Sequence, residues 1–348
     1  MSEKIRVGVI GCGSIAKQRH GYEYHQNQNV EIAGFFDPLR ERAQGLVDLY
    51  GGQIYEKAEV MISDASIDAI SVCAANKYHA DLSILALDHG KHVLCEKPMA
   101  TNLLQCEAMV EAAKRNGKRL LIGQNQRLSP AHAEAKRLLK SGQLGRVITF
   151  QSTFGHAGPE MWSADKSANT WFFKKDLASF GSMADLGIHK IDLILYLIDS
   201  PVKSVLSVMG TLDKTFEDGS PIEVDDNSQN ILCFRNGAIG AVTTSWTHYG
   251  EENNSTVLYC ENGILKLYAD PEYSVIITWK NGEVDRRKID RMQTNTDAQQ
   301  ESSGVIDQFI HSVRTGLPSV LDAENVFESM KVVYACLRSA ETGGAVNL

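Results

Sequence analysis

A lysine stands at the end of an apolar run in the segment HVLCEKPMA, residues 92–100. The run has the pattern of a buried strand, and Glu96, Lys97 and Pro98 follow it directly. In a sheet of parallel strands, ligands bind outside the carboxyl ends of the strands. Pro98 restricts the backbone of Lys97 to extended conformations. Lys97 is therefore a candidate to direct its ammonium group at a ligand oxygen, although most lysines simply lie on the surface.

A second candidate group is the acid and the histidine in GSMADLGIHKIDL, residues 181–193. In a helix, Asp185 and His189 are one turn apart and share a face. They could act as a base and its orienting group, or as two metal ligands. They could also be a capping aspartate and a histidine satisfied in the core, which is the commoner reading of such a pair taken alone.

The segment VIGCGSIA has the pattern G-x-G-x-x-A between an apolar run and a helical stretch. Gly11 permits a tight turn, Gly13 lets the backbone approach a pyrophosphate, and Ala16 allows close packing of helix and strand. The amino end of the following helix favours negative charge. The pattern therefore predicts a dinucleotide site. The residues expected at the cofactor from this loop are Gly11, Gly13, Ser14 and Ile15.

An acid at the end of the second apolar run supports that prediction. Asp37 follows VEIAGFF, where a carboxylate can bind the hydroxyls of the adenosine ribose. The same charge would repel a 2′-phosphate, which favours NAD over NADP, although Arg40 and Arg42 nearby weaken the preference. Asp37 could also cap a helix ahead of Pro38, and the two roles are compatible.

The elements that position these residues alternate in the first third of the chain. Short apolar runs and helical stretches follow one another in order, which predicts a doubly wound α/β domain with a parallel sheet. The domain ends where the pattern changes, near Leu128 to Pro130, so we expect it to cover residues 1–128. The expected strands lie at 5–10, 30–36, 68–74, 91–96 and 118–124, and the expected helices at 14–26, 37–50, 77–89 and 102–115.

The rest of the chain, residues 129–348, has a different pattern. Three Asn-Gly pairs separate short apolar runs, and such pairs favour hairpin turns. They stand at Asn236-Gly237, Asn262-Gly263 and Asn281-Gly282. We expect an α+β domain with a largely antiparallel sheet over about 146–288. The expected helices lie near 184–198, 303–315 and 322–341.

Too few helices are expected in this second domain to cover both faces of its sheet. An apolar open face would be buried against a second subunit, so we expect a homodimer or homotetramer.

Composition excludes several classes of protein. The chain has 348 residues and a formal net charge of −8 without a basic tract, so nucleic acid is not an expected partner. Its apolar stretches are too short to cross a membrane, and its beginning does not have the pattern of a signal peptide. Seven cysteines occur without a C-x-x-C pair, which argues against structural zinc and a disulfide framework. We expect a cytoplasmic protein without a metal.

Taken together, GVIGCGSIA, CEKPMA and DLGIHKIDL resemble the glucose–fructose oxidoreductase, inositol dehydrogenase and MocA-type oxidoreductase family. The resemblance covers essentially the whole chain, and AANKYHADLSILALDHGKHVLCEKPMA is its most specific part. The segment GQNQRLSP is similar to the family's domain junction. One departure is FGSM, where many members have a run of glycines before the aspartate. The resemblance implies an N-terminal Rossmann domain and a C-terminal domain with an open mixed sheet whose outer face forms subunit contacts.

The resemblance also implies residue roles. Lys97 would stabilise charge on the substrate oxygen as hydride leaves its carbon. His189 would accept the hydroxyl proton, with an ordinary pKa of about 6.5. Asp185 would hold a substrate hydroxyl or orient the other two. The further residues expected at the cofactor are Asn76, His79, Glu96 and Arg127.

The substrate implied by the family is a sugar, polyol or cyclitol that reacts with NAD(P). His156, Trp162 and Trp171 are candidates to line its pocket, since aromatic faces pack on the C–H faces of a sugar ring; core packing is their alternative role. Two other functions stay open. One is a glycoside-cleaving enzyme that oxidises transiently and recycles its NAD, and the other is a catalytically silent sugar sensor.

Overall fold

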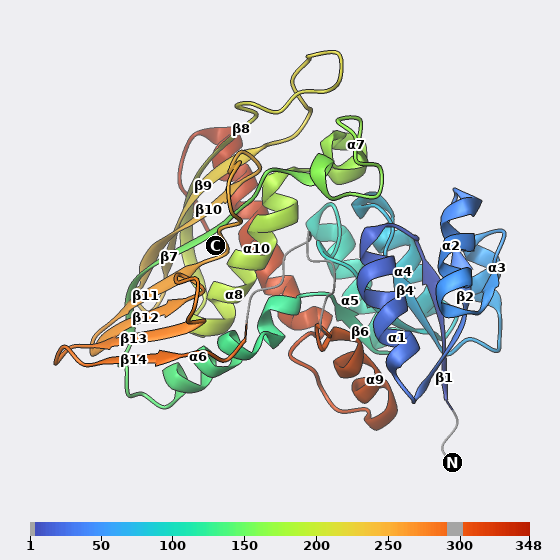
Figure 1. The fold of residues 1–348 in the computed structure, drawn as a ribbon, viewed down its shortest axis with the longest axis horizontal. Coiled ribbons are helices and arrows are strands. Elements are labelled where there is room, and N and C mark those ends of the chain that lie inside the picture. The colour runs from blue at the N-terminus through green and yellow to red at the C-terminus, as the bar shows by residue number, and fades with distance from the viewer. Residues whose placement is uncertain (1–3, 291–301) are drawn as a thin grey trace.

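Two sheets with helices between and around them make up the computed structural model, which describes residues 4–290 and 302–348 (Figure 1). The first sheet belongs to the amino-terminal domain and the second to the rest of the chain. The predicted combination of a doubly wound parallel sheet and a mixed, largely antiparallel sheet is confirmed.

The first sheet has six strands, and every neighbouring pair is parallel. Strand order reverses beside β1, which is the point where doubly wound sheets bind ligands. In spatial order the strands are β3 (Gln53–Ile54), β2 (Val30–Phe36), β1 (Ile5–Ile10), β4 (Ala69–Val72), β5 (His92–Cys95) and β6 (Leu120–Ile122).

The helix that follows the glycine loop begins as a π-helix, η1 (Ala16–Gly21), and continues as α1 (Tyr22–Gln26). A Cβ at Gly21 would lie 2.6 Å from the ring of Tyr50, so glycine allows this close approach. Short π-helical segments are frequent at functional sites. The other helices of this domain are α2 (Arg40–Tyr50), α3 (Ala58–Ser63), α4 (His79–Asp88) and α5 (Leu103–Asn116), of which α3 was not predicted.

The second sheet has nine strands, and only the pair β7–β10 is parallel. Gly237 and Gly282 have φ angles of +90° and +91° and form the predicted turns. Gly263 instead begins a strand, so that turn lies one residue earlier. In spatial order the strands are β14 (Val284–Arg287), β13 (Val275–Trp279), β12 (Gly263–Leu267), β11 (Thr256–Cys260), β7 (Val147–Gly155), β10 (Ile239–Ser245), β9 (Asn227–Phe234), β8 (Val202–Gly210) and β15 (Val346–Asn347).

Two helices of the second domain, α8 (Ile188–Ile198) and α10 (Ala323–Thr342), lie between the sheets (Figure 1). The first contacts β7, and the second contacts both β8 and α5 of the first domain. The sequence reading missed α6 (Pro130–Lys140), which begins with a proline at its first turn, a known start signal. A short helix, α7 (Lys175–Ala178), lies beside the first domain.

The opposite face of the second sheet carries exposed apolar side chains. Leu206 on β8 pairs directly with Ile231 on β9, and they are 46% and 41% exposed. Val208 on β8 and Ile239 on β10, which flanks β9 on its other side, are exposed as well. This face has the apolar character that was expected for a subunit contact.

Near the end of the chain, α9 (Val305–Thr315) returns to the first domain (Figure 1). Ile306 and Phe309 belong to one apolar cluster with Val7 and Val9 of β1. The boundary at residue 128 therefore stays a prediction, and the chain crosses back over it.

Candidate active site

A cavity of about 710 Å³ contains most of the predicted site residues from both domains. The glycine loop and the ends of β2, β4 and β5 form one wall, and the segment after β7 together with the start of α8 forms the other. The predicted residues that line it are Gly11, Gly13, Ser14, Ile15, Asp37, Asn76, His79, Glu96, Lys97, Trp162, Trp171, Asp185 and His189.

The glycine loop has the shape that a pyrophosphate needs. Gly11 has a φ angle of +90°, and a Cβ there would lie 2.6 Å from the backbone of Cys73. Gly13 faces open space, with no atom within 4 Å of a built Cβ. The loop therefore leaves room for a dinucleotide, and the backbone of Gly13 and Ser14 would hold its phosphates.

Asp37 lies at the end of β2 with a fixed orientation. Its carboxylate accepts hydrogen bonds from the N–H groups of Cys12 and Leu39, both at 2.8 Å. It does not cap α2, whose N-cap residue is Leu39. Each carboxylate oxygen can accept a further bond, so the acid is prepared to receive ribose hydroxyls.

Lys97 and Asp185 meet across the two domains. Lys97 Nζ donates to Asp185 Oδ1 at 2.9 Å and to the Asp185 carbonyl at 3.0 Å. Trp246 Nε1 donates to the other carboxylate oxygen at 3.1 Å. Burial raises the pKa of Asp185, but the charges of Lys97 and His156 and the hydrogen bonds from Lys97 and Trp246 together outweigh it, so the net shift is downward. The Lys97–Pro98 peptide is cis.

Asp185 lies on a second π-helix, η6 (Met183–Gly187), which leads into α8. The carboxylate of Asp225 holds its beginning, since it accepts the N–H groups of Gly181 at 2.7 Å and Met183 at 2.9 Å and the hydroxyl of Ser182 at 2.8 Å. A Cβ at Gly181 would lie 1.9 Å from the Asp225 carbonyl oxygen. The FGSM segment therefore keeps the one glycine that this contact requires.

His189 lines the cavity one turn after Asp185. Its Nδ1 atom is buried without a hydrogen-bond partner in the described part of the chain. Burial, and then the charge of Lys97, lower the pKa of His189 well below 6.5. The expectation of an ordinary pKa was therefore wrong, because the sequence does not reveal how completely the ring is enclosed.

Glu96 belongs to a buried chain of hydrogen bonds behind the cavity. His20 Nε2 lies 2.8 Å from Glu96 Oε1, and His20 Nδ1 lies 3.0 Å from Ser71 Oγ, which contacts Tyr24 Oη at 2.8 Å. Burial raises the pKa of Glu96, but the bond from His20 and nearby positive charges outweigh it and lower the pKa to about 2. Glu96 is thus held ionised at the cavity wall.

Asn76 and His79 connect segments around the cavity. Asn76 donates to the carbonyl of Ala178 in the second domain at 2.9 Å. The ring nitrogens of His79 lie 2.7 Å from the Pro98 carbonyl and 2.9 Å from the Ala74 carbonyl. His79 therefore ties the segment after β4 to the segment after β5.

Arg127 has a different place from the one expected. Its guanidinium donates two hydrogen bonds of 2.6 Å to the buried carboxylate of Asp192, and it is not among the residues that line the cavity. Arg127 and Asp192 are far apart in the chain, so no sequence pattern predicted that they would pair.

The aromatic candidates gather at one side of the cavity. Trp171 stacks on Phe172 at a centroid distance of 3.9 Å, and Trp162 meets Phe172 edge-on at 5.1 Å. His156 lies behind this lining, with Nδ1 accepting the N–H of Gly158 at 2.9 Å and Nε2 3.7 Å from Asp185 Oδ2.

Several polar residues in the cavity wall escaped the sequence reading, because no local pattern marks them. Trp246 does not line the cavity, but its indole fixes Asp185, and no local pattern indicates this contact. The unpredicted polar residues beside the aromatic group and His189 are Asn125, Gln126, Glu252 and Asn254.

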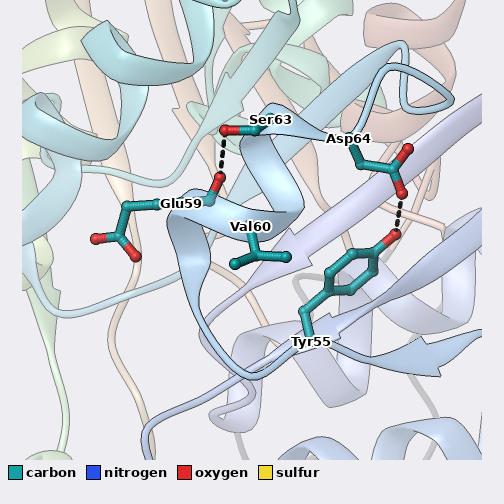
Figure 2. A pocket seen from close by; sticks show the side chains of 5 residues that line it. All are labelled: Tyr55, Glu59, Val60, Ser63 and Asp64. Carbon is teal, nitrogen blue, oxygen red and sulfur yellow. Dashed lines mark hydrogen bonds between the residues drawn. The ribbon is translucent and has the colours of Figure 1, made fainter.

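A second hollow, of about 450 Å³, lies on the first domain (Figure 2). Tyr55 Oη donates to Asp64 at 2.6 Å, and Ser63 Oγ donates to the Glu59 carbonyl at 2.7 Å. The carboxylate of Glu59 points away from this tyrosine (Figure 2). Because these polar groups pair with one another, we assign no ligand to the hollow.

Clusters of metal ligands and membrane-spanning helices are absent from the described residues. Within residues 4–290 and 302–348, no three His, Cys, Asp or Glu side chains are grouped as around a metal ion. No helix in these ranges combines the length and the apolar character needed to span a bilayer.

Comparison with known proteins identifies the class. Residues 5–124 match the GFO/IDH/MocA oxidoreductase family with an NAD-binding Rossmann fold, and residues 132–266 match the GFO/IDH/MocA C-terminal domain. The chain belongs to this family and is an oxidoreductase of the dehydrogenase type, as the resemblance implied.

Individual relatives are sugar dehydrogenases. The chain is 28% identical over 359 residues to D-glucoside 3-dehydrogenase of Escherichia coli (strain K12), covering 100% of this chain and 98% of the relative. It is 32% identical over 245 residues to glucose-6-phosphate 3-dehydrogenase of Bacillus subtilis (strain 168), covering 69% and 67%. A solved structure of levoglucosan dehydrogenase in complex with NADH and levoglucosan has the same fold, with a TM-score of 0.86, 22% identity and 99% coverage of each chain.

Proposed function

We propose that this enzyme transfers a hydride from a secondary alcohol of a sugar, polyol or cyclitol to NAD. The observation that carries the proposal is the pair of Lys97 and Asp185, which lies with His189 in the same cavity as the glycine loop. NAD supplies the hydride acceptor when bound. The chain supplies the groups that bind, orient and deprotonate the alcohol.

Each of the three residues has a distinct role in this proposal. An ammonium group has three donors, and Asp185 occupies two donor directions of Lys97, which leaves one for the substrate oxygen. That donor stabilises the negative charge that develops on the oxygen. The lowered pKa of His189 keeps its imidazole neutral, so it can accept the hydroxyl proton. Asp185 fixes the lysine.

Within this substrate class we favour a pyranose sugar. The named relatives oxidise a glucoside and glucose 6-phosphate, and a structural neighbour binds levoglucosan. The aromatic group of Trp162, Trp171 and Phe172 offers flat apolar faces at the cavity wall. Such faces suit the C–H surface of a pyranose ring.

We further propose NAD as the preferred cofactor, because Asp37 presents a negative charge where the adenosine ribose would bind. The apolar outer face of the second sheet supports a homodimer or homotetramer. All seven cysteines are free thiols, which suits a reducing compartment, and we propose a cytoplasmic location.

A glycoside-cleaving enzyme that recycles its NAD is the second candidate, since it would use the same alcohol oxidation as its first step. The presence of Lys97, Asp185 and His189 together weighs against a silent sensor.

The test is a panel of glycosides, free pyranoses, polyols and cyclitols, each mixed with the enzyme and NAD while the absorbance of reduced nicotinamide is followed. We expect net NADH with at least one pyranose. Cleavage of a glycoside without net NADH would instead support the recycling enzyme, and binding without either reaction would support the sensor.

A further inference from the structure

A segment of the second domain lies directly on the cofactor cradle of the first. It is the connection between β7 and α7, and it meets the glycine loop where Ser14 Oγ donates to the carbonyl of Trp162 at 3.3 Å. Three residues further on, the carboxylate of Asp165 forms an ion pair with the guanidinium of Arg42 on α2. Both contacts join the two domains at the cavity.

Arg42 is the cation that matters for the choice of cofactor. It lines the cavity together with Asp37. A basic side chain at this place is what binds the 2′-phosphate of NADP in dinucleotide domains. The other nearby arginine, Arg40, forms an ion pair with Glu56 and does not line the cavity. In the sequence alone, both arginines weaken the predicted preference for NAD. In the structure, only Arg42 lines the cavity.

The pairing with Asp165 changes the balance of charge around the ribose site. The titratable residues that line this part of the cavity are Asp37, Arg42, Lys57, Glu59 and Asp165. Three of these residues are acids and two are bases, and Arg42 forms an ion pair with one of the acids. Arg42 and Asp165 are each about one third exposed, so a competing phosphate could reach the guanidinium if the aspartate were neutral.

We propose that Asp165 is a specificity-determining residue that excludes NADP by holding the guanidinium of Arg42 in an ion pair. The choice of cofactor is then made jointly by the two domains, because the segment that covers the cradle carries one of the charges that select the ligand. This inference rests on the proposed function as a dinucleotide-dependent enzyme.

The experiment measures the dissociation constants of NAD and NADP by calorimetry, without sugar, for the full chain and three variants. Asp165→Asn keeps the shape of the side chain and removes its charge. Asp165→Asn combined with Arg42→Gln removes the freed cation as well. Asp176→Asn is the control, because Asp176 forms another ion pair between the domains, with Lys77 at 3.9 Å, and does not line the cavity.

We expect Asp165→Asn to bind NADP about tenfold more tightly than the unmodified enzyme while its affinity for NAD changes by less than about threefold. The double variant should lose the gain for NADP, and Asp176→Asn should resemble the unmodified enzyme for both cofactors. Thermal unfolding of each variant would verify that the fold is intact.

Three results would overturn the proposal: an unchanged affinity for NADP in Asp165→Asn, a parallel change for both cofactors, or a gain that persists in the double variant. A failure of the proposed function itself is recognised separately, since the unmodified enzyme would then bind neither NAD nor NADP.

Discussion

His20 Nε2 lies 2.8 Å from Glu96 Oε1, and both side chains are buried. Because Glu96 is ionised, Nε2 must donate to it. Ser71 Oγ lies between His20 Nδ1 and Tyr24 Oη, so every member of the chain has a hydrogen-bond partner. Glu96 also accepts the N–H of Lys97 at 3.2 Å. The chain of hydrogen bonds therefore fixes the backbone from which Lys97 projects.

This arrangement predicts that the protein loses stability as the pH becomes acid. The pKa of Glu96 falls from 4.5 to about 2 on folding, so its contribution is present above pH 4.5 and is lost as pH falls toward 2. Glu96→Gln should lower the free energy of unfolding at pH 7 by about 3 kcal/mol and flatten its slope over that range. Urea unfolding at several pH values measures this. Glu107→Gln, at the surface of α5, is the control, and an equal slope in both variants would contradict the prediction.

The chemical step should depend on the ammonium of Lys97. Lys97→Ala should lower kcat by about 10²–10³-fold and leave the dissociation constant of NAD nearly unchanged, because the glycine loop and Asp37 hold the dinucleotide. Lys97→Arg should not restore activity, since a planar guanidinium does not replace a compact ammonium. Steady-state kinetics and calorimetry measure both quantities. Lys77→Ala is the control, and near-normal turnover of Lys97→Ala would remove this residue from the mechanism.

The enclosed His189 predicts an unusual pH profile. Its pKa lies well below 6.5, so the neutral base persists as the solution becomes mildly acidic. We expect kcat/KM for alcohol oxidation to stay level through pH 6.5 and to fall only at lower pH. His189→Ala should be much less active, and its remaining activity should no longer fall at low pH. His25→Asn, at an exposed residue of α1, should keep the activity and the pH profile of the unmodified enzyme. A decline centred at pH 6.5 would show an ordinary histidine instead.

Trp246 is predicted to be a positioning residue. Trp246→Phe preserves an aromatic ring but removes the hydrogen bond to Asp185 Oδ2. A bond to a charged group is typically worth about 1.5 kcal/mol or more, so kcat should fall about tenfold while KM changes little. Trp279→Phe on β13 is the matched control. Equal kcat values for the two variants would mean that the indole only fills space.

The outer face of the second sheet should hold subunits together. In light scattering we expect a dimer or tetramer, and the double change Leu206→Asp and Ile231→Asp should reduce the particle size, because two charges then oppose burial of the paired side chains. Val60→Asp, which also changes an exposed apolar residue but on α3, should leave the assembly intact. A monomer in the unmodified protein would contradict this prediction.

Short sequence patterns predicted the parts of the site whose residues are neighbours in the chain. The strand, glycines and helix around Gly11, and the lysine after β5, follow from neighbouring residues alone. The pairing of Arg127 with Asp192 and the bond from Trp246 to Asp185 join residues far apart in the chain, and periodicity contains no information about such partners. The pKa of His189 depends on side chains from both domains, so it could be read only from the packed structure.

The return of α9 to the first domain affects how the protein folds as it is synthesised. Val305, Ile306, Phe309 and Ile310 complete an apolar cluster that begins with Ile5. The first 128 residues emerge from the ribosome long before these four apolar residues of α9. Until α9 has been synthesised, part of the core of the nucleotide-binding half is therefore exposed to water. Its cooperative folding therefore depends on the final part of the chain, and the two halves are not interchangeable modules.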